Sequence, residues 1–473
     1  MKHAKTKLAE KFGALFLALS VSFSPATSLA ATSSSGGAAA GADTAQNSLL
    51  IAKPAVVQVT NIVTGELIIQ APAAMELNTP ALAGKSYPFT LGATGSGFFV
   101  SPDGYLVTNG HVANPDDQLT AYYAVSQMAP VIFKDAVTTV AAATLGYTPP
   151  ADIVEQAYQQ TLQSTYGGDV QKLADELYQD FRSGKLKIDN IKKSNFIQLG
   201  YAAGSQKKVE QVGKPARLID SPYKGEFDSN DLAILKIEGS NFPTVPLGDG
   251  QNIQIGKEIY AIGYPGIVQE LMGQLTDEGS QLEPSMTKGV ISAKKKLTDG
   301  TEAFQTDAAI THGNSGGPAV DTGGKVVGVT TWSLGDNPGG EGFNFLVSVE
   351  EVKRLLTRNN VKTDATSLST AAWAKGLDLF GQKKYSDALK EFEKAKNLYP
   401  DNLDLQGYIT KCQEAIARGE DKSGSGSWGW VILAAFLVGG LILVGIIVLV
   451  IVLVAKNSGG KSGQGTEKPS EKK

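Results

Sequence analysis

The sequence is poor in cysteine and histidine, and these scarcities exclude several kinds of site. It has one cysteine, Cys412, so it can form neither an internal disulfide nor a multi-cysteine zinc or iron–sulfur centre. The three histidines, at positions 3, 111 and 312, leave little room for a histidine-rich metal site. We therefore predict no metal and no cofactor, and any histidine chemistry must use one of three side chains.

Net charge is also low, at -4, and it is unevenly distributed. Residues 1–30 carry four Lys and one Glu, and residues 456–473 carry five Lys and two Glu. The remaining body, 31–455, therefore has a net charge of about -10. Nucleic-acid binding needs a basic surface, so we predict no nucleic-acid partner. With 42% hydrophobic residues, the chain is too apolar to be wholly disordered.

Both basic ends adjoin apolar runs. Residues 1–30 combine lysines, a short apolar run and small residues before Ala30, which predicts a cleaved signal peptide; an uncleaved anchor is the alternative.

Residues 428–455 contain no charge and would form a helix of about 42 Å, longer than a ~30 Å hydrocarbon core. A buried core helix would be shorter. The positive-inside rule makes the tail 456–473 cytoplasmic. We expect a single-pass cell-membrane protein with an extracytoplasmic body; the lack of an N-x-S/T sequon favours a bacterial source.

Composition divides the body into further segments. Residues 31–49 are rich in Ala, Gly, Ser and Thr, which predicts a disordered lead. Residues 50–362 contain many short β-type runs separated by turn residues and few helical crossovers, which favours an antiparallel barrel or sandwich. Helical spacing interrupts this pattern, and we predict a helical insertion over 116–193. Ser348 and Glu351 predict a capping box for the helix that closes this domain.

A small helical module is predicted over 366–418. Its small and aromatic residues sit at the offsets of a tetratricopeptide repeat: Gly376, Tyr385, Ala388, Phe392, Ala395 and Pro400. Such repeats usually need about three copies for stability, so a stalk or docking hairpin competes with a peptide-binding groove. Residues 370–418 remain a candidate surface for a protein partner. Residues 419–427 predict a flexible linker.

The most informative string is HGNSGGP at 312–318. Glycines around Ser315 allow a tight turn that exposes its hydroxyl and lets backbone N–H groups converge. An acyl-transfer nucleophile with an oxyanion hole requires this arrangement, and the expected donors are the N–H groups of Ser315 and Gly313. His312 is expected to be a loop residue that lines the site rather than a second base.

A base and an orienting acid precede this string. His111 follows a strand-like run in TNGHV, and Asp231 opens another in NDLAILKI. The chain order His–Asp–Ser is one of the known orders of the catalytic triad. Asp231 would fix the tautomer of His111, and His111 would take the proton of Ser315. Asp307 is another nearby acid, but we expect Asp231 to fill this role.

Six strings together resemble the HtrA/Deg branch of the chymotrypsin-fold serine proteases: GSGFFVSPDGYLVTNGHV, DLAILKI, YAIGYP, TKGVIS, QTDAAI and GNSGGPAV. The resemblance implies a mainly β fold of two six-stranded antiparallel barrels, with the triad in the cleft between them. It also implies cofactor-free peptide-bond hydrolysis, with His111, Asp231 and Ser315 in the roles above. Three features depart from the family: the long His111-to-Asp231 interval, the lack of a PDZ-like segment, and an extension around 266–284.

The resemblance also gives a coarse expectation for specificity. Trypsin-type enzymes have an Asp six residues before the nucleophile, and Ala309 occupies that position here, followed by Ile310. An apolar pocket base predicts preference for small or medium aliphatic residues. We expect a membrane-anchored extracytoplasmic serine endopeptidase that acts on polypeptides, in quality control or surface-protein processing. The alternative is a catalytically weak scaffold that binds proteins through the insertion and the helical module.

Overall fold

The computed structural model describes residues 39–71, 79–200, 209–225, 230–264, 283–310, 313–334 and 343–423. The chain divides into two compact units. The first contains the described residues up to Ala374 together with Lys394–Leu403, and the second contains Lys375–Glu393 and the described residues from Asp404 onward.

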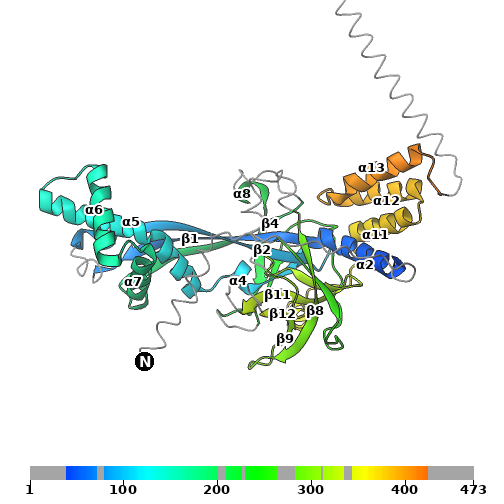
Figure 1. Cartoon of the computed structure of the whole chain (residues 1–473), viewed down its shortest axis with the longest axis horizontal. Coiled ribbons are helices and arrows are strands. Elements are labelled where there is room, and N and C mark those ends of the chain that lie inside the picture. The colour runs from blue at the N-terminus through cyan, green and yellow to red at the C-terminus, as the bar shows by residue number, and fades with distance from the viewer. Residues whose placement is uncertain are drawn as a thin grey trace, which may run out of the picture. The chain divides into compact units, whose positions relative to one another are not determined.

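The first unit contains two closed antiparallel barrels of six strands each, as the sequence predicts (Figure 1). The first barrel has the order β1-β2-β3-β6-β5-β4 and comprises β1 (Val56–Ile69), β2 (Ser86–Phe99), β3 (Tyr105–Thr108), β4 (Leu186–Gln198), β5 (Lys214–Asp220) and β6 (Ala233–Lys236). The second has the order β10-β11-β12-β9-β8-β7 and comprises β7 (Glu258–Gly263), β8 (Ser285–Lys296), β9 (Glu302–Thr306), β10 (Pro318–Asp321), β11 (Val326–Leu334) and β12 (Phe343–Ser348).

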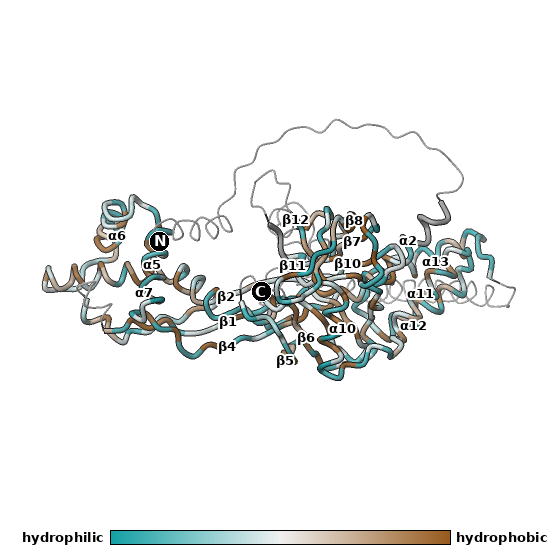
Figure 2. The backbone as a smooth tube through the Cα atoms, turned by 90° about the horizontal axis from the view of Figure 1, so that it is seen from below, coloured by the Kyte–Doolittle hydropathy of each residue, from teal (hydrophilic) through white to brown (hydrophobic). Residues whose placement is uncertain are grey.

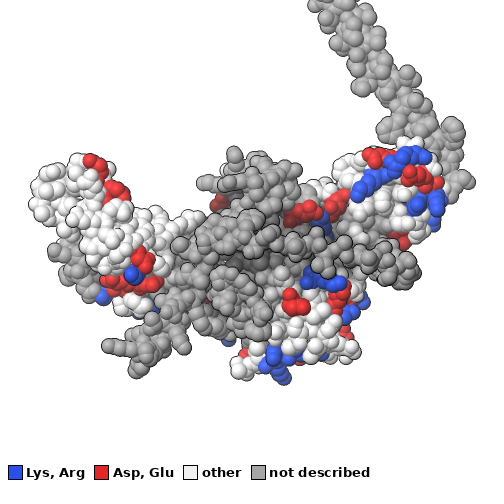
Figure 3. Space-filling model, in the orientation of Figure 1, with Lys and Arg blue, Asp and Glu red and all other residues white. Residues whose placement is uncertain are grey.

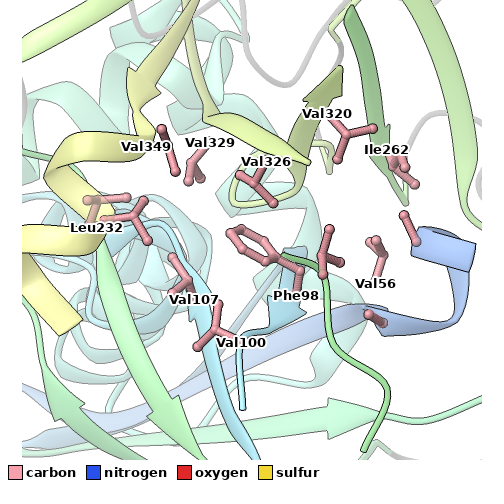
Figure 4. Close-up of a cluster of buried hydrophobic side chains, with 14 of the residues drawn as sticks. Val56, Phe98, Val100, Val107, Leu232, Ile262, Val320, Val326, Val329 and Val349 are labelled. Carbon is pink, nitrogen blue, oxygen red and sulfur yellow. The ribbon is translucent and has the colours of Figure 1, made fainter. Parts of the chain in front are cut away.

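A shared apolar cluster joins the two barrels. Phe98 and Val107 enter it from the first barrel, and Val320, Val326 and Val329 enter it from the second (Figure 4). Phe98 is fully buried, and burial of each such side chain stabilises the fold by about 1.5–3 kcal/mol. Figure 2 shows apolar residues concentrated where β6, β10 and α10 (Val349–Arg358) adjoin. The cluster therefore fixes one barrel against the other.

Strands β1, β2 and β4 continue beyond the first barrel as a three-stranded arm. Pairing continues to the far end of β1: Ile68 pairs with Ser86 of β2, and Ile69 pairs with Leu186 of β4. This arm carries the helical insertion (Figure 1), which consists of α5 (Asp117–Leu145), α6 (Ala151–Tyr166) and α7 (Val170–Arg182). The predicted insertion ran to residue 193, but its last part, from Leu186, is strand β4.

Local signals explain the arm helices. The Asp116 carboxylate accepts hydrogen bonds from the N–H groups of Gln118 and Leu119 and so caps α5, and Gly146 ends it in the left-handed conformation. Helix α6 begins at Ala151, directly after Pro149–Pro150. The helices bury an apolar stripe against the arm strands, in a core whose members include Leu67, Phe89, Ile132, Tyr158, Leu162, Leu173 and Leu177.

Two expectations near the domain ends are wrong. Residues 39–49 belong to helix α2 (Ala39–Ala52) rather than to a disordered lead, because Leu49 is buried in the inter-barrel cluster. In α10, Ser348 accepts the Glu350 N–H as an N-cap, but the capping box does not close. Glu351 instead accepts the N–H of Glu302 on strand β9, at 3.0 Å. That contact ties α10 to the second barrel.

Short helical segments complete the first unit: η2 (Lys53–Ala55), η3 (Pro80–Leu82), α4 (Gly110–Ala113) and α8 (Val209–Val212). The start of the helical module is also part of this unit. Ser367 Oγ donates to the Phe242 carbonyl at 2.8 Å, and Trp373 Nε1 donates to the Leu50 carbonyl at 2.9 Å. Phe242 also packs edge-on against Tyr399, with ring centroids 6.2 Å apart.

Three helices occupy the predicted module: α11 (Leu368–Gly381), α12 (Tyr385–Leu398) and α13 (Asp404–Ala417). Within the second unit, a Cβ at Gly376 would lie 2.4 Å from the Phe392 ring, so the first two helices approach closely at this glycine. Cys412 is fully buried, and burial raises the pKa of its thiol to about 12. The Asp421 carboxylate accepts from Ser386 on α12, so the linker predicted from residue 419 is partly hydrogen-bonded.

Several predictions fall on residues outside the described ranges: the signal peptide, the span 428–455, the tail 456–473 and His312. Most of the extension at 266–284 also lies there. In the ranges that are described, α5 alone is long and apolar enough to cross a membrane, judged by length and composition. Because α5 contributes Val125, Ala129 and Ile132 to the arm core, we treat it as part of the arm.

Candidate active site

His111 and Asp231 lie together, as the sequence predicts. His111 is on the short helix α4 that follows β3, and Asp231 comes just before β6, which pairs with β3. His111 Nδ1 lies 2.6 Å from Asp231 Oδ2, and the His111 backbone N–H donates to Asp231 Oδ1 at 2.9 Å. These two contacts from one residue hold the carboxylate against the imidazole.

Asp231 is buried, with 5% of its surface exposed, and two more residues hold it. Thr331 Oγ1 donates to Asp231 Oδ2 at 2.6 Å, and Asn109 Nδ2 donates to the Asp231 carbonyl at 2.6 Å. Thr331 is on β11 of the second barrel, so the carboxylate is held from both barrels. Sequence reasoning missed Thr331 and Asn109. Asn109 stands inside the TNGHV string, but no local pattern marks Thr331.

The charges of the pair shift both pKa values. Burial alone disfavours the imidazolium, but the Asp231 charge and its hydrogen bond outweigh burial and raise the pKa of His111 above 6.5. Burial likewise opposes ionisation of Asp231. The charge of His111 and the hydrogen bonds from His111 and Thr331 outweigh this effect and lower the pKa of Asp231 below 3.8. Asp231 is therefore ionised at neutral pH and can stabilise a protonated His111.

The Ser315 hydroxyl is directed to the same strand. Ser315 Oγ donates to the Thr331 carbonyl at 3.3 Å, and in the part of the chain that the structure describes it has no hydrogen bond to His111. Thr331 therefore contacts two of the three predicted residues, Asp231 through its hydroxyl and Ser315 through its carbonyl. Proton transfer from Ser315 to His111 would require a contact that the described residues do not form. Such contacts are often long or unformed without substrate.

The nucleophile loop requires its glycines. Gly313 has φ = 95° and Gly316 has φ = 86°, a region that side chains other than glycine rarely adopt. A Cβ on Gly316 would lie 2.2 Å from the Ser96 carbonyl oxygen, so only glycine lets the loop pack against the first barrel. Neither Gly313 N–H nor Ser315 N–H has a hydrogen-bond acceptor among the residues that the structure describes. Both remain available as oxyanion donors.

The other residues predicted at the site are Asp307, Ala309 and Ile310, and they contact the second barrel. Asp307 Oδ1 accepts the Val290 N–H at 2.6 Å, so this acid binds the backbone of β8. Ala309 is exposed, and its carbonyl accepts from Thr287 Oγ1 at 2.7 Å. Ile310 packs partly against the core of the second barrel. Neither contact establishes a substrate pocket.

Comparison with known proteins agrees with this architecture. Residues 191–329 match the family model of the trypsin-like peptidase domain. A probable periplasmic serine endoprotease DegP-like from Pseudomonas putida (strain W619) is 36% identical over 135 residues, which cover 28% of this chain and 25% of the relative. The serine endoprotease DegS from Haemophilus influenzae is 30% identical over 148 residues, covering 30% and 39%.

Solved structures were matched as well. The HtrA-type protease AlgW with decapeptide has a TM-score of 0.35 and 19% identity, with 67% of each chain covered. The serine endoprotease from Yersinia pestis has a TM-score of 0.32 and 20% identity, covering 67% of this chain and 66% of that one. The chain spans only 25–39% of the length of the two curated relatives named above. The double barrel and the matched region together support a trypsin-like peptidase domain of the HtrA/DegP type.

The opposing effects at His111 give a testable prediction. Replacing Asp231 with Asn removes the charge that raises the pKa and leaves the burial that lowers it. We expect the pKa of His111 to lie above 6.5 in the wild type and below 6.5 in Asp231→Asn. The measurement is a pH titration of ¹³C-histidine chemical shifts, which is simple because the chain has three histidines. An unchanged pKa in the variant would contradict this assignment.

Proposed function

We propose that the protein is a serine endopeptidase with the triad His111, Asp231 and Ser315. The observation that carries the proposal is the buried Asp231 carboxylate, which binds His111 Nδ1 and the hydroxyl of Thr331, the residue whose carbonyl accepts from Ser315. The match of residues 191–329 to a trypsin-like peptidase domain supports it.

In the proposed reaction, Ser315 Oγ attacks the carbonyl carbon of the substrate and His111 Nε2 takes the hydroxyl proton. The carbonyl π bond opens, and the N–H groups of Gly313 and Ser315 bind the resulting oxyanion. The C–N bond then breaks, and His111 gives its proton to the leaving amine. Water, deprotonated by His111, then attacks the acyl carbon. The ester bond to Ser315 Oγ breaks, His111 returns its proton to Ser315 Oγ, and the carboxylic acid product leaves. Throughout, Asp231 stays ionised and stabilises the imidazolium.

The proposal includes a location. A cleaved signal peptide at 1–30 and a membrane span at 428–455 would place the protease outside the cytoplasm, with the Lys-rich tail 456–473 inside. Relatives such as the DegP-like protein of Pseudomonas putida are described as probable periplasmic endoproteases. We infer a role in the quality control or processing of extracytoplasmic proteins, with polypeptides as substrates.

Replacing Ser315 with Ala tests the activity and its location together. We expect loss of hydrolysis by roughly 10⁶-fold, because the triad acts as a unit. A membrane-impermeant fluorophosphonate should label the wild type in spheroplasts and fail to label Ser315→Ala. The matched control is Ser164→Ala, which changes an exposed serine on α6 and should label normally. A wild type that labels only after lysis contradicts the location, and one that never labels contradicts the activity.

The pocket assignment gives a separate prediction. We propose that Ala309 and Ile310 lie at the base of the primary specificity pocket, where Ala309 takes the position of the Asp that binds Lys or Arg in trypsin-type enzymes. The expected profile from a peptide library is cleavage after small or medium aliphatic residues. Ala309→Asp should move the preference toward Lys or Arg. Efficient cleavage after Lys or Arg by the wild type would overturn the assignment.

A second candidate function, the binding of protein partners, is favoured by the arm tip. We use this name for residues 136–153, where α5 ends and α6 begins. No charged residue occurs between Asp135 and Asp152. Large apolar side chains are exposed there: Val140 by 40%, Leu145 by 46%, Tyr147 by 59% and Ile153 by 43%. In Figure 3 this end of the arm is mostly free of charged side chains. Exposed apolar patches of this kind mark interaction sites.

Added charge at the arm tip separates the two functions. A photo-cross-linker at Thr144 should capture partner proteins in cells, and Leu145→Glu with Tyr147→Glu should reduce that capture at least tenfold by adding charge to an apolar contact. Hydrolysis of a short peptide should stay unchanged. The matched control, Gln159→Glu with Gln160→Glu, adds equal charge at exposed positions of α6 and should keep the cross-link. Capture that survives the tip charges, or that requires Ser315, would rule out this candidate.

A further inference from the structure

The buried Ser96 hydroxyl lies between the two barrels, at a point the proposed mechanism does not use. Ser96 is on β2 of the first barrel and has no exposed surface. Its Oγ donates to the Gly313 carbonyl at 2.6 Å and accepts the Tyr264 N–H at 2.9 Å. Gly313 opens the nucleophile loop, and Tyr264 follows β7 of the second barrel. One hydroxyl thus connects β2 to two segments of the other barrel.

The backbone of Ser96 holds the same loop. Its N–H donates to the Ser315 carbonyl at 2.8 Å, and its own carbonyl accepts from Thr108 Oγ1 at 2.6 Å. Ser96 therefore contacts both residues whose N–H groups form the proposed oxyanion hole. Thr108 comes just before the segment that carries His111, so Ser96 also links the loop to the strand that precedes the base.

We propose that Ser96 is a positioning residue that sets the direction of the Ser315 N–H, one of the two proposed oxyanion donors, by fixing the carbonyls of Gly313 and Ser315 on either side of it. This inference rests on the proposed peptidase function. Gly313 lacks a side chain and has φ = 95°, so its own conformational preferences hold its two peptide planes weakly. Anchoring the carbonyl of Gly313 restricts ψ, and anchoring the carbonyl of Ser315 restricts the far side of the turn. The Ser315 N–H lies between these two anchored carbonyls, so its peptide plane keeps one direction.

Fixed donor direction matters because an oxyanion hole works by preorganisation. Donors that already point at the developing charge need no reorganisation when the tetrahedral intermediate forms. The surroundings of Ser96 are tight: a Cβ on Gly263 would lie 2.8 Å from its Oγ, and a Cβ on Gly317 would lie 3.2 Å from its Cβ. Because the hydroxyl is enclosed, water cannot easily replace it as donor to Gly313.

The test compares Ser96→Ala with the wild type in the full-length protein. We expect kcat to fall about 10–100-fold with KM nearly unchanged, because the lost stabilisation belongs to the transition state. The inhibition constant of a peptide aldehyde, whose hemiacetal presents an oxyanion, should rise by a similar factor. The acid limb of the pH profile should not move, since His111 and Asp231 keep their contacts.

Two variants serve as controls. Ser101→Ala removes another buried serine hydroxyl near the same strand, which donates to Asp103 in the β2–β3 turn, and it should keep the wild-type kcat. Ser96→Cys preserves the shape with a weaker donor and should give an intermediate kcat. If Ser96→Ala lowers the melting temperature, the Cys variant still separates loss of the hydrogen bond from loss of fold.

A readout that needs no activity completes the test. Hydrogen exchange at residues 313–317 should be faster in Ser96→Ala and unchanged in Ser101→Ala, because Ser96 orders that loop. A wild-type kcat in Ser96→Ala, or reduced kcat with unchanged aldehyde inhibition, would overturn the role of Ser96. A wild type without hydrolysis would overturn the proposed function instead. In that case the exchange measurement still tests Ser96: equal exchange at 313–317 in Ser96→Ala and the wild type would show that Ser96 does not order the loop.

Discussion

The site depends on one buried carboxylate, that of Asp231. An ionised carboxylate in the protein interior is unfavourable unless donors satisfy it, and here the donors come from both barrels. His111 donates from the first barrel through its backbone, with its ring nitrogen also in contact, and Thr331 donates from the second. If the barrels separated, the carboxylate would lose the Thr331 donor. The hydrogen bonds of Asp231 and the apolar packing of the barrels around Phe98 therefore both join the two barrels.

The arm adds a large helical structure without disturbing this arrangement, because its strands are also barrel strands. The chain leaves the site after α4, and the carbonyl of Ala113 accepts from Asn61 Nδ2 on β1 at 3.1 Å and from Asn195 Nδ2 on β4 at 3.0 Å. Lys193 on β4 holds the next turn through the Pro115 carbonyl at 2.6 Å. Both ends of the insertion are thus fixed to the strands that carry the arm. Its length, between His111 and Asp231 in the chain, does not separate the two residues in space.

The sequence alone predicted the features that depend on residues close together in the chain. The glycines around Ser315, the strand before His111 and the strand after Asp231 are short-range patterns, and the structure brings His111 and Asp231 within 2.6 Å. Thr331 and Ser96 could not be found in this way, since their importance lies in contacts across 100 and 217 residues of chain. Composition also misled at residues 39–49, where small residues predicted disorder. Buried Leu49 packs this helix onto the barrels, and tertiary contact decides the outcome for such weak local preferences.

Thr331 also explains how the serine can lie away from the base without disabling the site. Its hydroxyl fixes Asp231, and its carbonyl accepts the Ser315 hydroxyl at 3.3 Å, which is long for an O–H···O bond. Turning that hydroxyl to His111 exchanges a weak neutral bond for another of similar net strength, about 1 kcal/mol. The backbone of the loop need not move, because Ser96 N–H and the Thr330 carbonyl already hold it on both sides of the nucleophile. In the proposed mechanism, the step from this arrangement to a reactive one would begin with rotation of the Ser315 side chain within a loop that these contacts hold.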